Sequence, residues 1–484
     1  MLFSLQKNEW FGNLRVDFLS GLVVAFALIP EAIGFSIIAG VDPMIGLYAS
    51  FTMAVVIAFI GGRPAMISAA TGAMALLVVD LVKNHGLQYL LAATILTGIF
   101  QLLFGYLGIA KLMRFIPRSV MVGFVNALAI LIFTAQLTQF QHANWMMYAM
   151  VGVSLLILYG LPKFFKAIPA ALIAIIVMTV ISISLHLDLK TVGDMGNISS
   201  TLPVFLIPSI PFNLETLQII LPTALGLSIV GLLESLLTAS IVDDMTNTDS
   251  DKTREAKGQG IANIVTGFFG GMAGCAMIGQ SVINVSAGGR KRFSTLVAGI
   301  FLMVLIIVLG NWVVQIPMAV LVAIMIMVSI GTFDWRSFEY IRKGHFTDTA
   351  VMIVTVVIVV FTHNLAIGVI TGVILSAILF MVKISKIHVE SEIKPEKIIY
   401  KAKGQLFFAS VDNFTKAMAV TVENKRVLFD LSELHIWDDS GVEAIYKVIQ
   451  QFENAGNSVR MIGLNKESRR MMRQLKSYLK NSSH

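Results

Sequence analysis

Long apolar stretches separated by short polar connections make up most of the 484-residue chain. Seven of them precede a polar, proline-marked connection at residues 188–212, and seven follow it. Several are shorter than the ~20 residues that a helix perpendicular to the membrane needs, but the alternation of charged loops fits this number of crossings. The pattern predicts an α-helical polytopic membrane protein with about 14 segments, near residues 15–33, 43–60, 65–82, 88–109, 118–138, 144–161, 167–186, 214–241, 256–271, 278–290, 293–312, 316–332, 347–361 and 364–386.

Two glycine-rich stretches interrupt this pattern at corresponding positions of the two halves. The first, GGRPAMISAATGAM, runs from Gly61 to Met74, and the second, GGMAGCAMIGQSVINVSAGGRKR, runs from Gly270 to Arg292. The helical part of the second stretch, about Gly279 to Gly288, would rise only ~15 Å within a hydrocarbon core of ~30 Å. Paired interrupted segments indicate a midplane site between inverted repeats, here at about 14–186 and 214–386. Close packing of small residues without a ligand is the alternative.

A helix that starts inside the membrane exposes its first-turn N–H groups and the positive end of its dipole. An anion is the natural ligand of such a helix start. We therefore predict that a small anion is held by backbone N–H groups in both stretches, with the Ser281 hydroxyl as an added donor. The predicted substrate-binding residues are Ala70, Thr71, Gly72, Ala73, Gly279, Gln280 and Ser281.

The composition excludes a soluble globular protein, since 56% of residues are hydrophobic, 13% are charged and the mean hydropathy is +0.81. The net charge of +7 does not indicate a nucleic-acid partner, because the basic residues gather in alternate loops. The positive-inside rule places those loops and the N-terminus in the cytoplasm. The eight histidines show no metal-ligand spacing, and no nucleophile–base pair is recognisable. We expect neither an enzyme nor a bound cofactor.

The chain becomes polar beyond Lys386, where a strand-like alternation begins. Residues Lys425 to Leu434 are predicted to form a buried strand, and Val442 to Gly456 an amphipathic helix that precedes another strand, NSVRMIGL. Strands that alternate with helices indicate a small α/β domain. We therefore divide the chain into a transport domain at residues 1–388 and a cytoplasmic domain at 389–484.

Four stretches together carry a family resemblance: IPEAIGFSIIAGVDPMIGLYASF (Ile29 to Phe51), GLLESLLTASIVDDMTNT (Gly231 to Thr248), GQGIAN (Gly258 to Asn263) and the second interrupted stretch. They resemble the sulfate permease (SulP) anion transporters, which carry a C-terminal STAS domain. The resemblance implies two inverted seven-segment repeats, a core domain that moves against a gate domain, and a homodimer. It also implies an anion between the third and tenth segments. We expect a location in the bacterial cytoplasmic (inner) membrane, with the N-terminus and the STAS domain in the cytoplasm.

Two acidic residues within apolar segments are candidates for ion coupling. Glu31 follows Pro30, and an ionisable residue at such a position is costly enough to indicate a function. In family members with glutamate at this place it couples transport to protons. The alternative is that Glu31 lies nearer the surface and bonds to backbone opened by Pro30.

Glu234 and Thr238 lie one turn apart on one helix face, where they can bind a cation. In sodium-coupled bicarbonate members, an acid and a threonine at these positions form a sodium site with a threonine that matches Thr71. Here the acid is glutamate rather than aspartate. A protonated Glu234 that donates a hydrogen bond is therefore the open alternative to a sodium ion at Thr71, Glu234 and Thr238.

The leading hypothesis is a secondary active importer of bicarbonate, sulfate or a dicarboxylate, driven by protons or sodium through alternating access. Many relatives have an arginine where Gln280 stands, so a monovalent anion or one moved with a cation is favoured. WDDSG, at Trp437 to Gly441, resembles the STAS loop with a phosphorylatable serine, so Ser440 is a regulatory candidate and a cytoplasmic protein partner is expected. Two alternatives stay open: a nucleobase permease that reads its ring with Gln280 and Asn284, and a membrane regulator that transports nothing.

Overall fold

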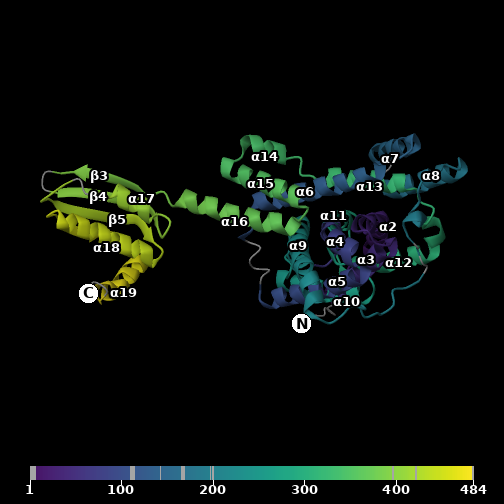
Figure 1. Ribbon diagram of the computed structural model, residues 1–484, viewed down its shortest axis with the longest axis horizontal. Helices are drawn as coiled ribbons and strands as arrows, with labels where there is room; N and C mark the ends of the chain where they lie inside the picture. The colour runs from purple at the N-terminus through teal and green to yellow at the C-terminus, as the bar shows by residue number, and fades with distance from the viewer. Residues whose placement is uncertain are drawn as a thin grey trace. The chain divides into compact units, whose positions relative to one another are not determined.

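The computed structural model describes residues 7–108, 115–141, 143–164, 169–196, 198, 201–394, 397–419 and 422–481. The chain folds into two compact units, Met1–Val373 and Ile374–His484, which Figure 1 draws from purple to yellow along the sequence. The boundary between the units falls inside the helix α16 (Leu365–Ile384). Each unit is described by itself below.

The first unit consists of two halves with the same order of elements: two helices, a three-residue strand with a shorter helix, and then long helices. The first half contains α1 (Lys7–Trp10), α2 (Leu14–Ala39), α3 (Pro43–Ile60), β1 (Ser68–Ala70), α4 (Gly72–His85), α5 (Leu87–Tyr106), α6 (Arg118–Leu137), η2 (Thr138–Phe140), α7 (Trp145–Phe164) and α8 (Ala170–Ser184). The second half contains η3 (Val192–Met195), α9 (Leu214–Thr246), α10 (Lys252–Phe268), β2 (Gly274–Ala276), α11 (Ile278–Ser286), α12 (Arg292–Val313), α13 (Met318–Thr332), α14 (Ser337–Lys343), α15 (Phe346–Thr362) and α16.

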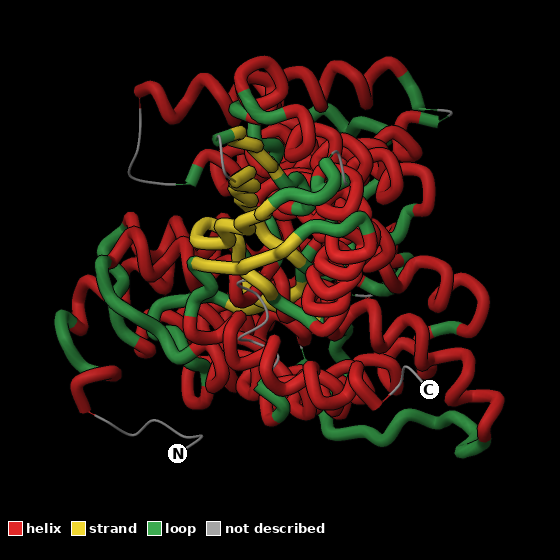
Figure 2. The backbone as a smooth tube through the Cα atoms, turned by 90° about the vertical axis from the view of Figure 1, so that its left-hand side faces the viewer, coloured by secondary structure: helices red, strands yellow, loops and turns green. Residues whose placement is uncertain are grey.

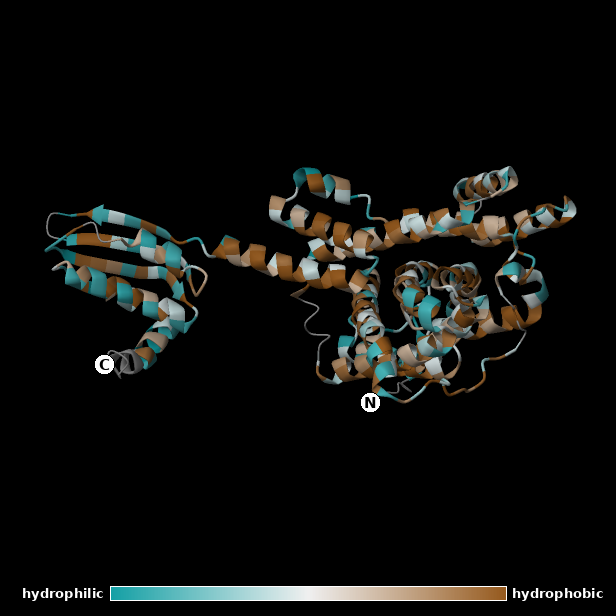
Figure 3. Ribbon diagram, in the orientation of Figure 1, coloured by the Kyte–Doolittle hydropathy of each residue, from teal (hydrophilic) through white to brown (hydrophobic). Residues whose placement is uncertain are grey.

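The two halves pack against each other in a reciprocal manner. Helix α5 of the first half packs on α9 and α10, and its counterpart α12 packs on α2 and α3. Among the described residues, nine helices are long and apolar enough to span a membrane, and α8 and α15 are shorter apolar helices. Figure 3 shows hydrophobic residues along most of α13 and α16. The polytopic helical architecture is therefore confirmed, while the count of 14 segments stays a prediction.

Both interrupted stretches contain a strand that the sequence pattern does not predict. The stretch from Gly61 forms β1 and then α4, and the stretch from Gly270 forms β2 and then α11. The second short helix begins one residue before and ends two residues before the expected range of Gly279 to Gly288. Gly288 lies outside it because its φ of 98° is left-handed, a conformation that glycine adopts easily.

The second unit is a four-stranded sheet with helices, as expected for a small α/β domain. It contains β3 (His388–Ile393), β4 (Lys397–Leu406), α17 (Val411–Ala417), β5 (Arg426–Ile436), α18 (Asp439–Asn454), β6 (Ser458–Ile462) and α19 (Lys466–Asn481). The strand order is β3-β4-β5-β6, with β3 antiparallel to β4 and the other pairs parallel. These strands are yellow in Figure 2. The predicted strand at Lys425 to Leu434 is confirmed as β5, and the predicted helix starts earlier, at Asp439.

The core of this domain packs three aromatic rings edge to face. Phe429 of β5, Phe452 of α18 and Tyr400 of β4 have ring centroids between 5.2 and 6.0 Å apart. All three are buried. Such pairs add to the hydrophobic burial that holds the C-terminal part of α18 on the sheet.

Candidate functional site

The strands β1 and β2 pair with each other and thereby bring the two interrupted stretches together. They are antiparallel, with Ser68 opposite Ala276 and Ala70 opposite Gly274. Each strand leads directly into a short helix, so the starts of α4 and α11 leave opposite ends of the same strand pair. The caps of the two helices, Thr71 and Met277, are four strand positions or ~13 Å apart in this register, so both helix starts lie near one another.

The first turns of the two short helices differ in their surroundings. In α4, the side chain of Thr71 caps the helix by accepting from Met74 N–H at 3.4 Å, and Gly72 is buried. A Cβ atom at Gly72 would lie 2.8 Å from Ile132 Cδ1 and 2.9 Å from Phe35 Cε1. In α11, no side chain caps the helix and Gly279 is exposed, with open space where its Cβ would be. The α11 start is therefore the accessible one in this conformation.

Two of the predicted donor residues bond within the protein. The Ser281 hydroxyl accepts from Ile67 N–H at 3.0 Å, and Ser281 N–H donates to the Met277 carbonyl at 3.0 Å. Ala70 N–H donates to Ser50 Oγ at 3.3 Å. The N–H groups of Ala70 and Ser281 can reach a substrate only after these bonds break, whereas the Ser281 hydroxyl donates only at 3.5 Å, to the Ile67 carbonyl. The first-turn N–H groups without an intrahelical partner belong to Gly72, Ala73, Ile278, Gly279 and Gln280.

Glu31 lies beside the start of α11. Helix α2 packs against both α4 and α11, and it continues through Pro30 without ending. The partly exposed Glu31 carboxylate accepts a hydrogen bond from the buried side chain of Gln280, the third residue of α11. A carboxylate and the open donors of a helix start are thus held next to each other.

Glu234 lies beside the start of α4, because α9 packs against α4 and β2. The Cys275 thiol donates to Glu234 Oε2 at 2.9 Å and lies 3.1 Å from Thr71 Oγ1, and Thr71 also bonds to the Glu234 side chain. Thr238 lies one turn further along α9, where its hydroxyl donates to the backbone carbonyl of Glu234 at 2.7 Å. Glu31 of the long helix α2 thus contacts the start of α11, and Glu234 of the long helix α9 contacts the start of α4. Sequence reasoning did not foresee the thiol in this group.

The three residues predicted for sodium therefore lie together, but a thiol stands among their oxygen atoms. Hard cations prefer oxygen ligands, whereas sulfur suits softer metals. Within the described residues, no group of three or more His, Cys, Asp and Glu side chains is arranged to hold a metal ion. In this conformation the Cys275 thiol donates to Glu234 and lies beside the Thr71 hydroxyl.

A polar face of α10 holds the strand pair in place. Glu255, Gln259 and Asn263 follow one another every four residues and are fully buried. Asn263 bonds to both backbone groups of Gly274, accepting from its N–H at 2.8 Å and donating to its carbonyl at 3.0 Å. Gln259 donates to Ser68 Oγ at 2.7 Å. Sequence reasoning used GQGIAN only as a family resemblance, although polar residues at helical spacing signal a common face.

Ser440 lies in the second unit at the start of α18. Asp438 caps this helix by accepting from Gly441 N–H at 2.9 Å, and it also accepts from Phe408 N–H at 2.8 Å. Ser440 is exposed in the first turn. A phosphate there would meet the positive end of the helix dipole, so the position is chemically suited to phosphorylation.

Comparisons with known proteins identify the family of the chain. The sulfate permease family model matches residues 14–144 and 137–355, and the STAS domain model matches residues 388–479. YbaR of Bacillus subtilis (strain 168), whose name provisionally calls it a sulfate transporter, is 62% identical over 470 residues, which cover 97% of this chain and 98% of YbaR. The bicarbonate transporter BicA of Picosynechococcus sp. is 25% identical and covers 97% of this chain and 92% of its own length.

Solved structures show the same fold. The transmembrane domain of a cyanobacterial bicarbonate transporter BicA matches with a TM-score of 0.65 and 26% identity, over 76% of this chain and 98% of that one. Murine Slc26a9, an anion transporter in the inward-facing state, matches with a TM-score of 0.85 and 18% identity, over 98% of this chain and 90% of that one. The relatives are transporters and not enzymes. On these matches, the chain belongs to the sulfate permease family and carries a C-terminal STAS domain.

Proposed function

We propose that the protein is a secondary active transporter that imports a small oxyanion, such as bicarbonate, sulfate or a dicarboxylate, together with a proton. The observation that carries this proposal is the α11 start, where exposed Gly279 adjoins Gln280 and its partner Glu31. Free N–H groups and a helix dipole attract anions there. The names of YbaR and BicA refer to sulfate and bicarbonate, which are both small oxyanions.

Glu31 supplies a physical reason for proton coupling. An ionised carboxylate beside the α11 start would occupy the same electropositive region as the substrate and repel it. Protonation of Glu31 removes this repulsion, so the anion and the proton favour each other's binding. Release of the proton on the other side of the membrane then favours release of the anion.

The second carboxylate favours a proton over sodium as the coupling ion. The Cys275 thiol lies within hydrogen-bond distance of both Glu234 and Thr71, at 2.9 and 3.1 Å. A sodium ion would have to displace this thiol to reach the oxygen atoms. A proton on Glu234 needs no such displacement, because the carboxyl group keeps its hydrogen-bonding neighbours.

Alternating access is supported by the different coverage of the two helix starts. Gly279 is exposed, while Gly72 lies under Phe35 and Ile132. One turn beyond Gly72, Leu76 lines a cavity of about 550 Å³ between α4 and α6. We infer that the anion reaches this cavity when α6 separates from α4, so the site between the helix starts opens to its two sides in turn.

The expected setting is the bacterial cytoplasmic membrane. The distribution of basic loops supports a cytoplasmic N-terminus and a cytoplasmic STAS domain. The family resemblance supports a homodimer, and exposed Ser440 is a candidate for phosphorylation or for contact with a cytoplasmic protein. The transport proposal does not depend on these assignments.

A nucleobase is less well supported as a substrate. Asn284, one of the two side chains expected to read a base, is fully buried. Its amide donates to the Ala65 carbonyl and to Ser294 Oγ, each at 2.8 Å. These bonds leave Gln280 alone at the α11 start, where it is bonded to Glu31.

Uptake by purified protein in liposomes tests the proposal. Labelled bicarbonate, sulfate, fumarate and uracil would be compared under an imposed pH gradient and, separately, an imposed sodium gradient. We expect one oxyanion to accumulate with an inward proton gradient and no accumulation of uracil. Accumulation driven by the sodium gradient alone would overturn the assignment of the proton as the coupling ion. Uptake of none of the four solutes would favour a membrane regulator that transports nothing.

A further inference from the structure

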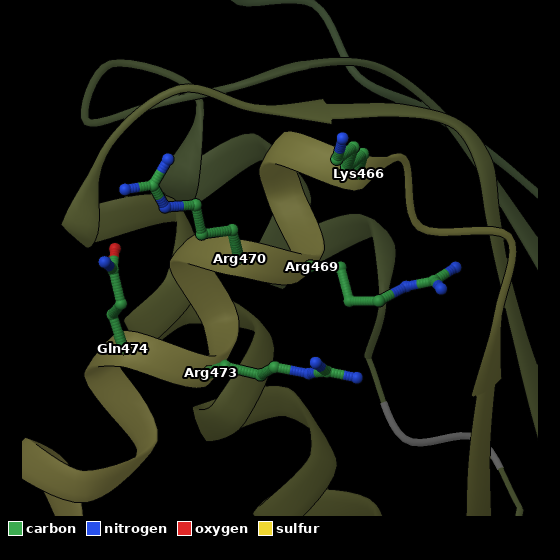
Figure 4. Close-up of a pocket in the computed structure, with 5 residues that line it drawn as sticks. All are labelled: Lys466, Arg469, Arg470, Arg473 and Gln474. Carbon is green, nitrogen blue, oxygen red and sulfur yellow. The ribbon is translucent and has the colours of Figure 1, made fainter.

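A concentration of positive charge on the STAS domain has no role in the transport proposal. Lys466, Arg469, Arg470 and Arg473 recur at i, i+3, i+4 and i+7 along α19, and with Gln474 they line an open groove of about 590 Å³. Figure 4 shows that Arg469 and Arg473 extend to one side of the helix and Arg470 to the other, with Lys466 near its start. We call these four cations the α19 basic face.

The rest of α19 explains why this face points away from the domain. Ser468 is fully buried and its hydroxyl accepts from Ile436 N–H at 3.1 Å, while Met471, Met472 and Leu475 pack in the hydrophobic core. These positions are offset by two residues, or ~200° of helical rotation, from the basic ones. The apolar side of α19 is therefore used inside the domain, and the basic side is left to solvent.

The charges of the basic face are not neutralised by any ion pair among the described residues. In the part of the chain that the structure describes, none of its four cations forms an ion pair. Arg469 donates to the Leu464 carbonyl at 2.9 Å, and the acid of the same turn, Glu467, faces His435 at 3.7 Å. Four positive charges therefore lie within ~10 Å of helix length without an acidic partner.

We propose that the α19 basic face docks on an anionic phospholipid surface. The apolar helix α16 ends at Ile384 and β3 begins at His388, so only three residues tether the domain to a helix long enough to span a membrane. Clusters of four or more Lys and Arg residues near a membrane bind anionic lipid headgroups. The proposal depends on the membrane setting of the chain and not on the anion site.

The groove favours a lipid surface over a soluble nucleotide. Its lining residues are four cations and an amide, which provide no aromatic ring for stacking on a base. The phosphate groups of many lipid headgroups on one surface can each pair with a cation of the row, and no base or other group needs to be recognised. Because the apolar residues of α19 lie in the core, the contact is electrostatic and involves no insertion into the bilayer.

Arginine footprinting of the full-length protein tests this proposal. The protein would be placed in nanodiscs of phosphatidylcholine alone or with phosphatidylglycerol, treated with phenylglyoxal, and analysed by mass spectrometry. We expect modification of Arg469, Arg470 and Arg473 to slow in the anionic discs, and exposed Arg426 and Arg460 to be unaffected. The protection should disappear at 1 M salt, where the screening length falls to ~3 Å.

A double variant of the α19 basic face tests whether its charges cause the protection, and soluble pyrophosphate tests whether a lipid surface is needed. Each cation removed should weaken docking about fivefold, so Arg470→Gln with Arg473→Gln should lower the protection of Arg469 about 25-fold. The matched control, Lys447→Gln with Arg460→Gln, removes two exposed cations elsewhere in the domain and should change nothing. Equal modification in both kinds of disc overturns the proposal. Protection by pyrophosphate in neutral discs, without protection by anionic lipid, overturns it in favour of a soluble ligand.

Discussion

The starts of α4 and α11 are made from similar sequences but have different surroundings. Both follow a three-residue strand, and both have a glycine among their first two residues and a carboxylate nearby. Yet Gly72 is buried under Phe35 and Ile132, whereas Gly279 faces open space. Because one anion is proposed to lie between the two helix starts, this difference means that the site is open on its α11 side and covered on its α4 side in this conformation.

The carboxylates differ in the same way. Glu31 is partly exposed and its named partner is the side chain of Gln280. Glu234 is 7% exposed and bonds to Cys275 and Thr71. The glutamate at the open helix start is thus less covered than the glutamate at the closed one.

The largest effect should come from filling the open helix start. Gly279→Leu would place a side chain where the anion is proposed to bind, and loss of one or two hydrogen bonds to a charged ligand weakens binding about 100-fold. Substrate affinity measured with purified protein checks this. Gly152→Leu, at an exposed helical glycine that also has open space, is the matched control. If Gly279→Leu leaves the substrate affinity unaltered, the anion does not bind at the start of α11.

The next effect concerns the carboxylate at the open end. Glu31→Gln should abolish accumulation driven by a pH gradient, which is about tenfold per pH unit for one proton, and should spare exchange of labelled for unlabelled anion. The amide keeps the shape of the side chain but cannot carry a proton. Uptake and exchange in liposomes would be measured together, with exposed Glu339→Gln as control. Proton-driven uptake like that of the unaltered protein would reject the role of Glu31.

A matched pair of alanine substitutions compares the two glycines directly. Gly72→Ala puts a methyl group against Ile132 Cδ1 and Phe35 and should lower stability by ~1–3 kcal/mol, whereas Gly279→Ala should not. Thermal unfolding in detergent measures the difference. Adding Ile132→Val removes the Cδ1 atom that the new methyl meets, but Phe35 Cε1 at 2.9 Å remains, so the loss caused by Gly72→Ala should be smaller in the Ile132→Val background than in the unaltered protein. Equal stability of the two alanine variants would contradict the closed state of the α4 start.

The smallest effect is expected outside both helix starts. Ser440→Asp adds a negative charge in the first turn of α18, an interaction of ~0.3–1 kcal/mol at an exposed helix start. We expect the transport rate to change less than about fivefold and the substrate affinity to stay the same. Ser458→Asp, at an exposed serine of β6, is the control. A change in substrate affinity would show that the STAS domain influences the anion site. The difference between the two helix starts would then not be the only determinant of anion binding.

Several features of the site were predictable because they depend on residues close in sequence. Glycine, proline and small residues interrupted the two apolar segments, and a short helix inside a membrane must expose its first N–H groups. Glu31 was noticeable because an acid in an apolar run is rare. Its contact with Gln280, 249 positions away, was not predictable, because apolar periodicity does not say which helices pack together.

The pattern of the sequence by itself determined a helical membrane protein of two halves, two interrupted segments and a small α/β domain. Only the tertiary structure decided which helix start is open, that Cys275 stands between Thr71 and Glu234, and that the basic side of α19 faces solvent. The physical reason is the range of the interactions. Helix starts and amphipathic faces follow from neighbouring residues, whereas coverage by Ile132 or a thiol within 3.1 Å of a hydroxyl depends on how distant segments pack.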